Sequence, residues 1–198
     1  MPRYVAFLRG INLGKRRLSM ATLASIFQKM GHADVATFIA SGNVLFSTRS
    51  ENTATIEAKA SSELESALRY GVDVFVRTPD EVTRIAKSKP FPEDGLEGLI
   101  IHVGFFHQPL PPDIARKLSA MRTPADQLRV SGREYYWLCR TRTSESKVWT
   151  LPEVRALKLP TSTMRNMTSI RKLVAKHFEQ AHPLASAPGK GDASIDHA

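Results

Sequence analysis

Residues 35–47 read Val-Ala-Thr-Phe-Ile-Ala-Ser-Gly-Asn-Val-Leu-Phe-Ser. Apolar and β-branched residues lie on both sides of a Ser-Gly-Asn centre, and this pattern predicts a β-hairpin. Glycine and asparagine suit the centre because they accept the left-handed backbone conformations of tight turns. We therefore expect a strand over residues 35–40, a turn at residues 41–43 and a returning strand over residues 44–47.

The segments on either side of this hairpin complete a βαββαβ order. An apolar strand over residues 3–8 and a helix from its N-cap Ser19 to a stop at Gly31 come before it. A helix over residues 53–70 and a strand over residues 72–77 follow. This order is that of the ferredoxin-like split unit.

The pattern then repeats, and the Ser-Gly pairs of the two hairpin turns are 90 residues apart. The second set of predicted elements is a strand at 99–106, a helix at 112–121, strands at 128–131 and 134–139, a weak helix at 151–157, an extended piece at 160–164 and a last helix at 166–178. We therefore predict an α+β protein made of two ferredoxin-like, βαββαβ-type units and a C-terminal helix.

The first-unit strands also predict how the two units pack. Residues 4–8, 44–46 and 74–76 are nearly continuous apolar runs, which is typical of strands buried on both faces. The helices of one unit cover only one face of its sheet. We therefore expect the second unit to cover the other face, so that the chain forms one body.

Division of the chain follows from these elements. We expect a first ferredoxin-like unit at residues 1–78, a connecting helix and loop at 79–98, a second unit with the C-terminal helix at 99–178 and a disordered tail at 179–198. The connecting helix has Thr78 as N-cap, Pro79 at its first position and Glu81 in a capping box. The tail is rich in Ala, Pro, Gly, Ser and Asp and shows no periodicity. It therefore has too little apolar surface to offset the loss of entropy on ordering.

Composition excludes collagen-like, wholly disordered and membrane proteins. Hydrophobic residues make up 42% and charged residues 24% of the 198 residues, as in globular proteins. No apolar run approaches the roughly 20 residues that span a bilayer, so we expect no membrane partner. The single cysteine, Cys139, cannot form an intramolecular disulfide, and this fits a reducing cytoplasm.

The net charge of +9 is unevenly distributed. Residues 1–49 carry +6 and residues 111–178 carry +9, whereas residues 50–110 carry −4. Two basic blocks thus flank an acidic middle. This asymmetry suggests an anionic partner, although a solvated basic surface gives the same pattern.

Two polar loops are predicted to meet at one edge of the first sheet. In the ferredoxin-like strand order 4-1-3-2, the end of strand one lies beside the start of strand three. The residues brought together there are Arg9, Gly10, Asn12, Ser41, Gly42 and Asn43, with Lys15 close behind. Backbone N–H groups near glycines, together with Arg and Lys, can cradle an anion. The alternative is that these residues serve only turn geometry and loop capping.

Three motifs carry a family resemblance. They are Leu-Arg-Gly-Ile-Asn at residues 8–12, Ser-Gly-Asn-Val at 41–44 and Thr-x-Arg-Asn at 163–166. Over about residues 3–178 the chain resembles a widespread bacterial family of unknown function. The resemblance implies paired ferredoxin-like units and implies no activity. Similar proteins often have a glycine pair after the first motif, where this chain has Leu13-Gly14-Lys15, which adds a cation.

Arg165 and Asn166 are predicted to begin the last helix. Their side chains would then lie near free N–H groups and the positive end of the helix dipole, so both join the candidate anion-binding residues. The alternative is that Asn166 or Thr163 is only an N-cap and Arg165 a surface cation.

Several other candidate motifs lack a residue or a spacing that their chemistry requires. The segment from Gly10 to Lys15 is one residue too short for a phosphate-binding loop and lacks the following Ser or Thr. The six His residues show no metal-ligand spacing, and no Gly-x-Ser-x-Gly elbow is present. Residues 44–47 lack the aromatic pattern of RNA-recognition strands. We therefore predict no metal and no cofactor.

Three functions from different classes remain. Binding of a phosphate-bearing anion, as nucleic acid or as a nucleotide, at the basic sheet edge is the leading hypothesis. A small-molecule enzyme acting on an anionic substrate is the alternative, since the same edge could hold one such molecule, although neither a general base nor a nucleophile can be assigned. A protein–protein adaptor is the third.

Overall fold

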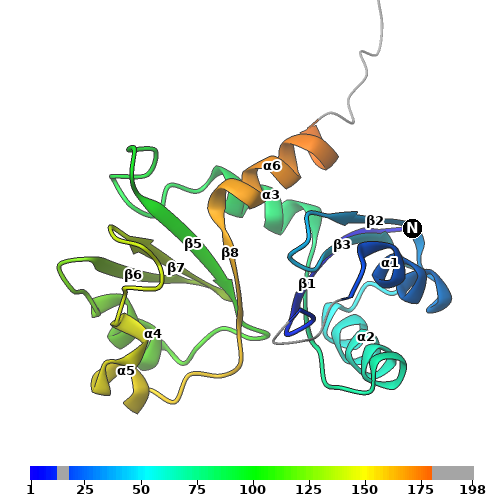
Figure 1. Ribbon diagram of the computed structural model, residues 1–198, viewed down its shortest axis with the longest axis horizontal. Helices are drawn as coiled ribbons and strands as arrows, with labels where there is room; N and C mark the ends of the chain where they lie inside the picture. The colour runs from blue at the N-terminus through cyan, green and yellow to red at the C-terminus, as the bar shows by residue number, and fades with distance from the viewer. Residues whose placement is uncertain (13–17, 180–198) are drawn as a thin grey trace, which may run out of the picture.

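The computed structural model describes residues 1–12 and 18–179 (Figure 1). It contains two four-stranded antiparallel sheets with the orders β2-β3-β1-β4 and β6-β7-β5-β8. Both orders are the predicted 4-1-3-2 arrangement, and β1 is antiparallel to both of its neighbours. The predicted α+β class, with two similar units and a C-terminal helix, is confirmed, and the repeat is consistent with a ferredoxin-like duplication.

The first unit has six elements: β1 (Arg3–Arg9), α1 (Met20–Lys29), β2 (Ala33–Phe38), β3 (Asn43–Ser47), α2 (Thr53–Leu68) and β4 (Asp73–Arg77). Ser19 caps α1 by accepting a hydrogen bond from Thr22 N, as predicted. The hairpin turn is wider than predicted because β2 ends at Phe38 and Ile39 takes a positive φ of 50°. A β-branched residue in that region is strained and cannot continue a strand.

The helix α3 (Pro79–Lys87) connects the two units. Its predicted capping box is present: Thr78 Oγ1 accepts from Glu81 N at 3.2 Å, and Glu81 Oε2 accepts from Thr78 N at 2.9 Å. Two N–H groups at the start of the helix, those of Thr78 and Glu81, are therefore satisfied locally.

The second unit contains β5 (Ile100–Phe105), α4 (Pro112–Ala120), β6 (Asp126–Ser131), β7 (Glu134–Cys139), the short helices η1 (Val148–Thr150) and α5 (Pro152–Ala156), β8 (Thr163–Asn166), α6 (Met167–Val174) and a final π-helical turn, η2 (Ala175–Glu179). The prediction that Arg165 begins the last helix is wrong, because Arg165 lies within β8. The extended piece predicted at residues 160–164 is instead the strand β8 at residues 163–166, which pairs with β5.

One hydrophobic core joins the two sheets. The rings of Phe7 on β1 and Phe105 on β5 stack with their centroids 4.2 Å apart. Buried residues of α3 and α6 complete this central cluster, and the two helices lie side by side at the top of Figure 1. Helices α1 and α2 cover the outer face of the first sheet, and α4 and α5 that of the second. The prediction of one body is confirmed.

Among the helices that the structure describes, none combines the length and the apolar composition that crossing a bilayer requires.

Candidate anion-binding cleft

A buried arginine of the second unit holds the end of β1 and the first hairpin turn. Arg165 donates from Nε to Asn43 Oδ1 at 2.6 Å and from Nη2 to the carbonyl oxygens of Leu8, at 2.8 Å, and Gly42, at 3.3 Å. Its Nη1 donates to Met164 O and Thr163 Oγ1. All five N–H groups of this guanidinium are therefore used inside the protein.

A buried arginine of the first unit does the same for the second. Arg77 donates from Nε to Glu134 Oε1 at 2.8 Å and from Nη2 to the carbonyl oxygens of Phe106, at 2.7 Å, and Arg133, at 3.4 Å. Its Nη1 donates to the carbonyl oxygen of Val76, the residue before it, as Arg165 does to Met164. The duplication thus extends to individual hydrogen bonds. We call each buried arginine, together with the groups that it binds in the other unit, a clasp.

The two clasps differ in charge. Arg77 has the carboxylate of Glu134 at 2.8 Å and that of Glu57 at 3.9 Å, whereas Arg165 meets the neutral amide of Asn43. In the part of the chain that the structure describes, Arg165 has no carboxylate within ion-pair distance. Burial lowers the pKa of the Arg165 guanidinium to about 10. A positive charge without a counter-charge therefore lies beneath the first hairpin turn.

The carbonyls of Leu8 and Phe106, one held by each of the two buried arginines, are followed at once by side chains that reach solvent. Arg9 follows Leu8, and its guanidinium is 3.2 Å from Asp73 Oδ2, with 54% of the side chain exposed. His107 follows Phe106 and is 40% exposed. Arg9 and His107 thus occupy equivalent positions in the two units, at the ends of β1 and β5.

The imidazole of His107 is held in one orientation. Its Nδ1 lies 2.8 Å from Glu57 Oε2, and its ring stacks on Phe75 with centroids 4.1 Å apart. The other oxygen of Glu57 accepts from Val76 N at 2.7 Å, so this buried carboxylate is itself fixed. Because a carboxylate only accepts, His107 carries its proton on Nδ1, and in the neutral ring Nε2 presents a lone pair.

His107 and Asp73 line one cleft of about 440 Å³. The other lining residues are Gln108, Pro109, Leu110, Pro111, Pro160 and Thr161, from the segments after β5 and before β8. The end of β1 and the start of β8 lie beside one another here, where Thr163 Oγ1 donates to Leu8 O at 3.4 Å. Apolar walls with a few convergent polar groups are typical of small-molecule sites.

The predicted loop and turn do meet at the sheet edge. Asn12 joins them, because its Nδ2 donates to Ala40 O at 3.4 Å and its Oδ1 accepts from Leu18 N at 2.8 Å. Ser41 is exposed, and its Oγ accepts from Asn43 Nδ2 at 2.9 Å. Gly10 has a positive φ of 84° at the start of the loop.

Three of the predicted residues lie beneath this edge and not on it. Asn43 is 1% exposed, and its remaining donor reaches Phe38 O. Gly42 has φ +77°, and a Cβ there would lie 2.7 Å from Ile11 Cδ1. Arg165 is buried because its side chain points inward from β8, so the alternative reading of this residue as a surface cation is wrong.

The last two predicted residues do not contribute to the edge. Asn166 pairs with His102 in the sheet and caps α6 by accepting from Thr168 N at 2.8 Å. Lys15 lies outside the described residues. Of the nine predicted residues, Arg9, Gly10, Asn12 and Ser41 therefore form the accessible part of the edge.

The sequence reasoning missed Glu57, Asp73 and His107. Glu57 is a carboxylate beside the inward-facing Ile56 of α2, and it is buried with it. His107 lies two residues beyond Phe105 of β5, as Arg9 lies two residues beyond Phe7 of β1. An alignment of the two repeats would have paired them. No three His, Cys, Asp or Glu side chains come together in a metal-binding arrangement within residues 1–12 and 18–179.

Comparisons with known proteins add a family and a fold. A solved structure of the conserved bacterial protein SP0830 from Streptococcus pneumoniae is similar, with 19% identity and a TM-score of 0.66 over 89% of this chain and 99% of that chain. At this identity the likeness concerns the fold alone. The sequence has no significant match among curated proteins. Residues 1–136 match the family described as "Protein of unknown function (DUF1697)", and the chain therefore belongs to the DUF1697 family.

Proposed function

We propose that this protein binds a small phosphate-bearing anion at the cleft lined by His107 and Asp73, beside the Asp73 partner Arg9. The supporting observation is that Arg9 and His107 follow the carbonyls of Leu8 and Phe106, which the two buried arginines hold. Asp73 connects the two side chains, since it pairs with Arg9 and lines the cleft with His107. The hydrogen bonds of Arg165 fix the backbone immediately before Arg9, and those of Arg77 fix it immediately before His107. A ligand therefore meets groups whose positions are set before it binds.

Charge supports an anion at this place. The guanidinium of Arg165 lies beneath the Ser41–Asn43 turn and has no carboxylate partner among the described residues, and a buried charge is poorly screened. Arg165 contributes through the electrostatic field of its charge, because all of its N–H donors are already hydrogen-bonded within the protein. Arg9 supplies the direct contact, and an incoming phosphate would replace Asp73 as its partner.

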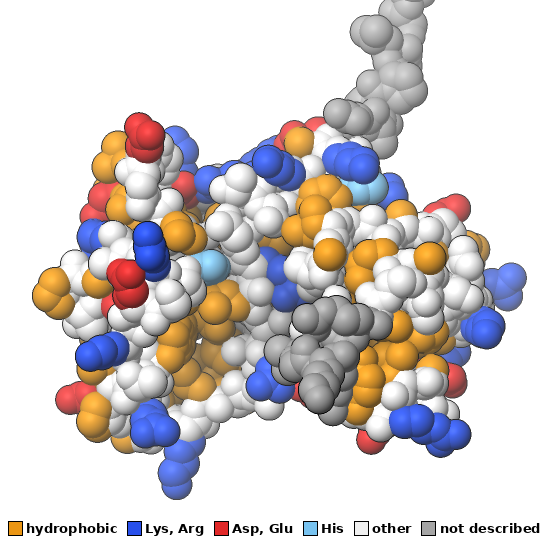
Figure 2. Space-filling view, viewed as in Figure 1, with side chains coloured by type: hydrophobic (Ala, Val, Ile, Leu, Met, Phe, Trp, Pro, Cys, Tyr) orange, Lys and Arg blue, Asp and Glu red, His pale blue; other side chains and the backbone are white. Residues whose placement is uncertain are grey.

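The cleft favours a small molecule over a nucleic acid. A volume of about 440 Å³ suits one nucleotide-sized ligand. Figure 2 shows the Lys and Arg side chains of this face scattered among acidic, apolar and uncharged ones, without a continuous basic band. Binding along a nucleic-acid backbone needs such a band.

A second candidate is acid–base catalysis on the bound anion, and it rests on the 2.8 Å contact between His107 and Glu57. In this reading Nε2 of His107 removes a proton from the substrate. Glu57 positions the ring and stabilises the imidazolium that forms. The adaptor hypothesis has less support, since large hydrophobic side chains exposed within the described residues are few: Met1, Ile39 and Leu96.

Calorimetric titration with inorganic phosphate, a nucleoside monophosphate and a short oligonucleotide, each at two salt concentrations, tests the proposal. Arg9→Ala should weaken binding of the monophosphate by on the order of 1.5–3 kcal/mol, or roughly ten- to 150-fold. Arg116→Ala, at an exposed position of α4, is the matched control and should bind normally. Unchanged affinity in Arg9→Ala would overturn the proposal, and tight, steeply salt-dependent binding of the oligonucleotide alone would favour nucleic acid.

A further inference from the structure

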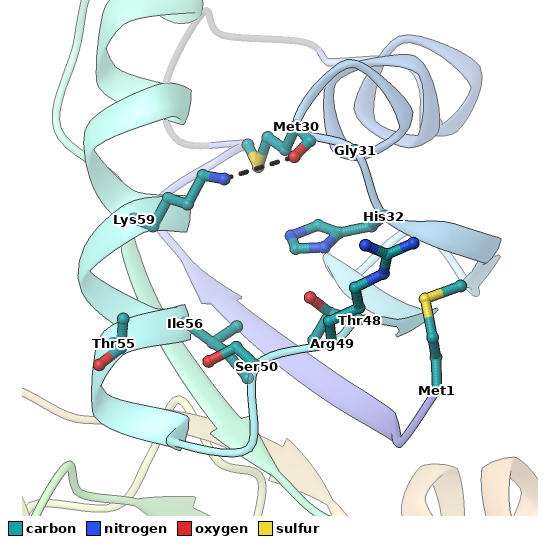
Figure 3. A pocket seen from close by; sticks show the side chains of 10 residues that line it. All are labelled: Met1, Met30, Gly31, His32, Thr48, Arg49, Ser50, Thr55, Ile56 and Lys59. Carbon is teal, nitrogen blue, oxygen red and sulfur yellow. Dashed lines mark hydrogen bonds between the residues drawn. The ribbon is translucent and has the colours of Figure 1, made fainter.

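A second cavity, of about 370 Å³, lies within the first unit (Figure 3). It is enclosed by the end of α1, the start of β2, the segment after β3 and the first turns of α2. Its lining residues are Met1, Met30, Gly31, His32, Thr48, Arg49, Ser50, Thr55, Ile56 and Lys59. It shares no lining residue with the cleft at His107.

The lining of this cavity is basic. His32, Arg49 and Lys59 come from three different segments, and Figure 3 shows their side chains around one space. The hydroxyl groups of Thr48, Ser50 and Thr55 add donors, and the described residues that line the cavity include no Asp or Glu. This set of groups complements an anion with several acceptor oxygens.

The donors around the cavity are incompletely used by the protein. Lys59 Nζ reaches Met30 O over 3.5 Å, the weak limit of a hydrogen bond. Arg49 has no ion pair, and the buried Nδ1 of His32 no hydrogen-bond partner, within the part of the chain that the structure describes. This contrasts with Arg9 and Arg77, which both have carboxylate partners. A buried polar atom without a partner is costly, and a ligand that satisfies it recovers that cost.

Part of the cavity wall is apolar. Met30 and Ile56 contribute it, and Ile56 belongs to the buried core of the unit. The His32 ring is held against Phe46, with centroids 4.5 Å apart. Burial and the charge of Lys59 lower the pKa of His32, so the ring is neutral near pH 7 and would gain a proton beside a bound dianion.

From this combination we propose that the cavity is a second ligand site, which takes a small phosphate monoester with an apolar body. The phosphate group lies among Lys59, Arg49 and the hydroxyl groups of Ser50 and Thr55. The apolar body lies against Met30 and Ile56. The site is independent of the cleft at His107, and neither proposal rests on the other.

Phenyl phosphate is a suitable probe, with phenol and inorganic phosphate as its two halves. Titration followed by ¹H–¹⁵N spectra should shift the amides of Gly31, Ser50 and Thr55, and the pKa of His32 should rise on binding. Lys59→Met should weaken phenyl phosphate binding about tenfold or more. Lys117→Met, on the exposed face of α4, should not. Arg49→Gln is the second variant should Lys59→Met fail to fold.

The outcomes separate the two sites. Loss of binding in Lys59→Met with normal binding in Arg9→Ala supports this inference whatever becomes of the cleft. Phenyl phosphate shifts confined to residues near Arg9 and His107 would overturn it and leave the cleft supported. Equal affinities for inorganic and phenyl phosphate would overturn the assignment of an apolar body. The absence of shifts from phenyl phosphate at every cavity amide would remove the site.

Discussion

The guanidinium of Arg165 donates to Asn43 Oδ1 across 2.6 Å, although the two residues are 122 positions apart. This contact joins the Thr-x-Arg-Asn segment to the Ser-Gly-Asn-Val turn. Its counterpart joins Arg77 to Glu134. Two of the three motifs that carried the family resemblance thus meet in one interaction between the units, whose first role is to hold the strand ends in place.

Arg165→Lys should lower the free energy of unfolding substantially, by about 3–5 kcal/mol. Lysine offers three donors from one point, and it cannot serve the carbonyls of Leu8 and Gly42 together with Asn43. Buried acceptors then lose their partners, and a buried charge loses hydrogen bonds. Urea unfolding measures the loss. A change below about 1 kcal/mol would mean that the clasp is replaceable by water.

Phe7→Ala should destabilise the second unit as well as the first. The Phe7 ring stacks on Phe105 of the other sheet, and truncation of a buried Phe costs about 3–5 kcal/mol. Both tryptophans of the chain, Trp137 and Trp149, lie in the second unit, so their fluorescence reports that unit alone. The fluorescence midpoint should fall together with the midpoint from circular dichroism. A fluorescence midpoint that stays in place would show that the units unfold separately.

Arg69→Gly should stabilise the protein by about 1 kcal/mol. Arg69 caps α2 in the left-handed region at φ 64°, where its N–H donates to Glu65 O. A side chain in that conformation costs roughly 1–2 kcal/mol, which glycine avoids. Arg116→Gly within α4 is the matched control and should destabilise by about 1 kcal/mol. A fall in melting temperature for Arg69→Gly would contradict the strain argument.

How much the sequence predicts depends on how local the signal is. The capping box of Thr78 and Glu81 is visible because both partners lie within one helical turn. Strand order followed from the βαββαβ pattern and correctly brought Asn12 to the hairpin turn. The direction of the Arg165 side chain was not predictable, because it depends on the register of β8 against β5. The contact of His107 with Glu57 joins positions 50 apart and depends on how the two units pack.

Acidification should reduce stability through His102, whose pKa burial lowers below its ordinary value of 6.5. The ring stacks on Trp137, and its Nε2 lies 3.3 Å from Thr143 Oγ1. As the pH falls through 6.5, the unfolded chain takes up a proton at this residue before the folded protein does. The free energy of unfolding therefore falls from pH 7 down to the folded-state pKa and levels off below it. His102→Gln should reduce this slope without abolishing it, because the pKa values of His32 and His177 are also lowered. Urea unfolding at a series of pH values, with ¹H titration of the His102 ring, measures both quantities. A His102 pKa at or above 6.5, with an unchanged slope in the variant, would contradict this assignment.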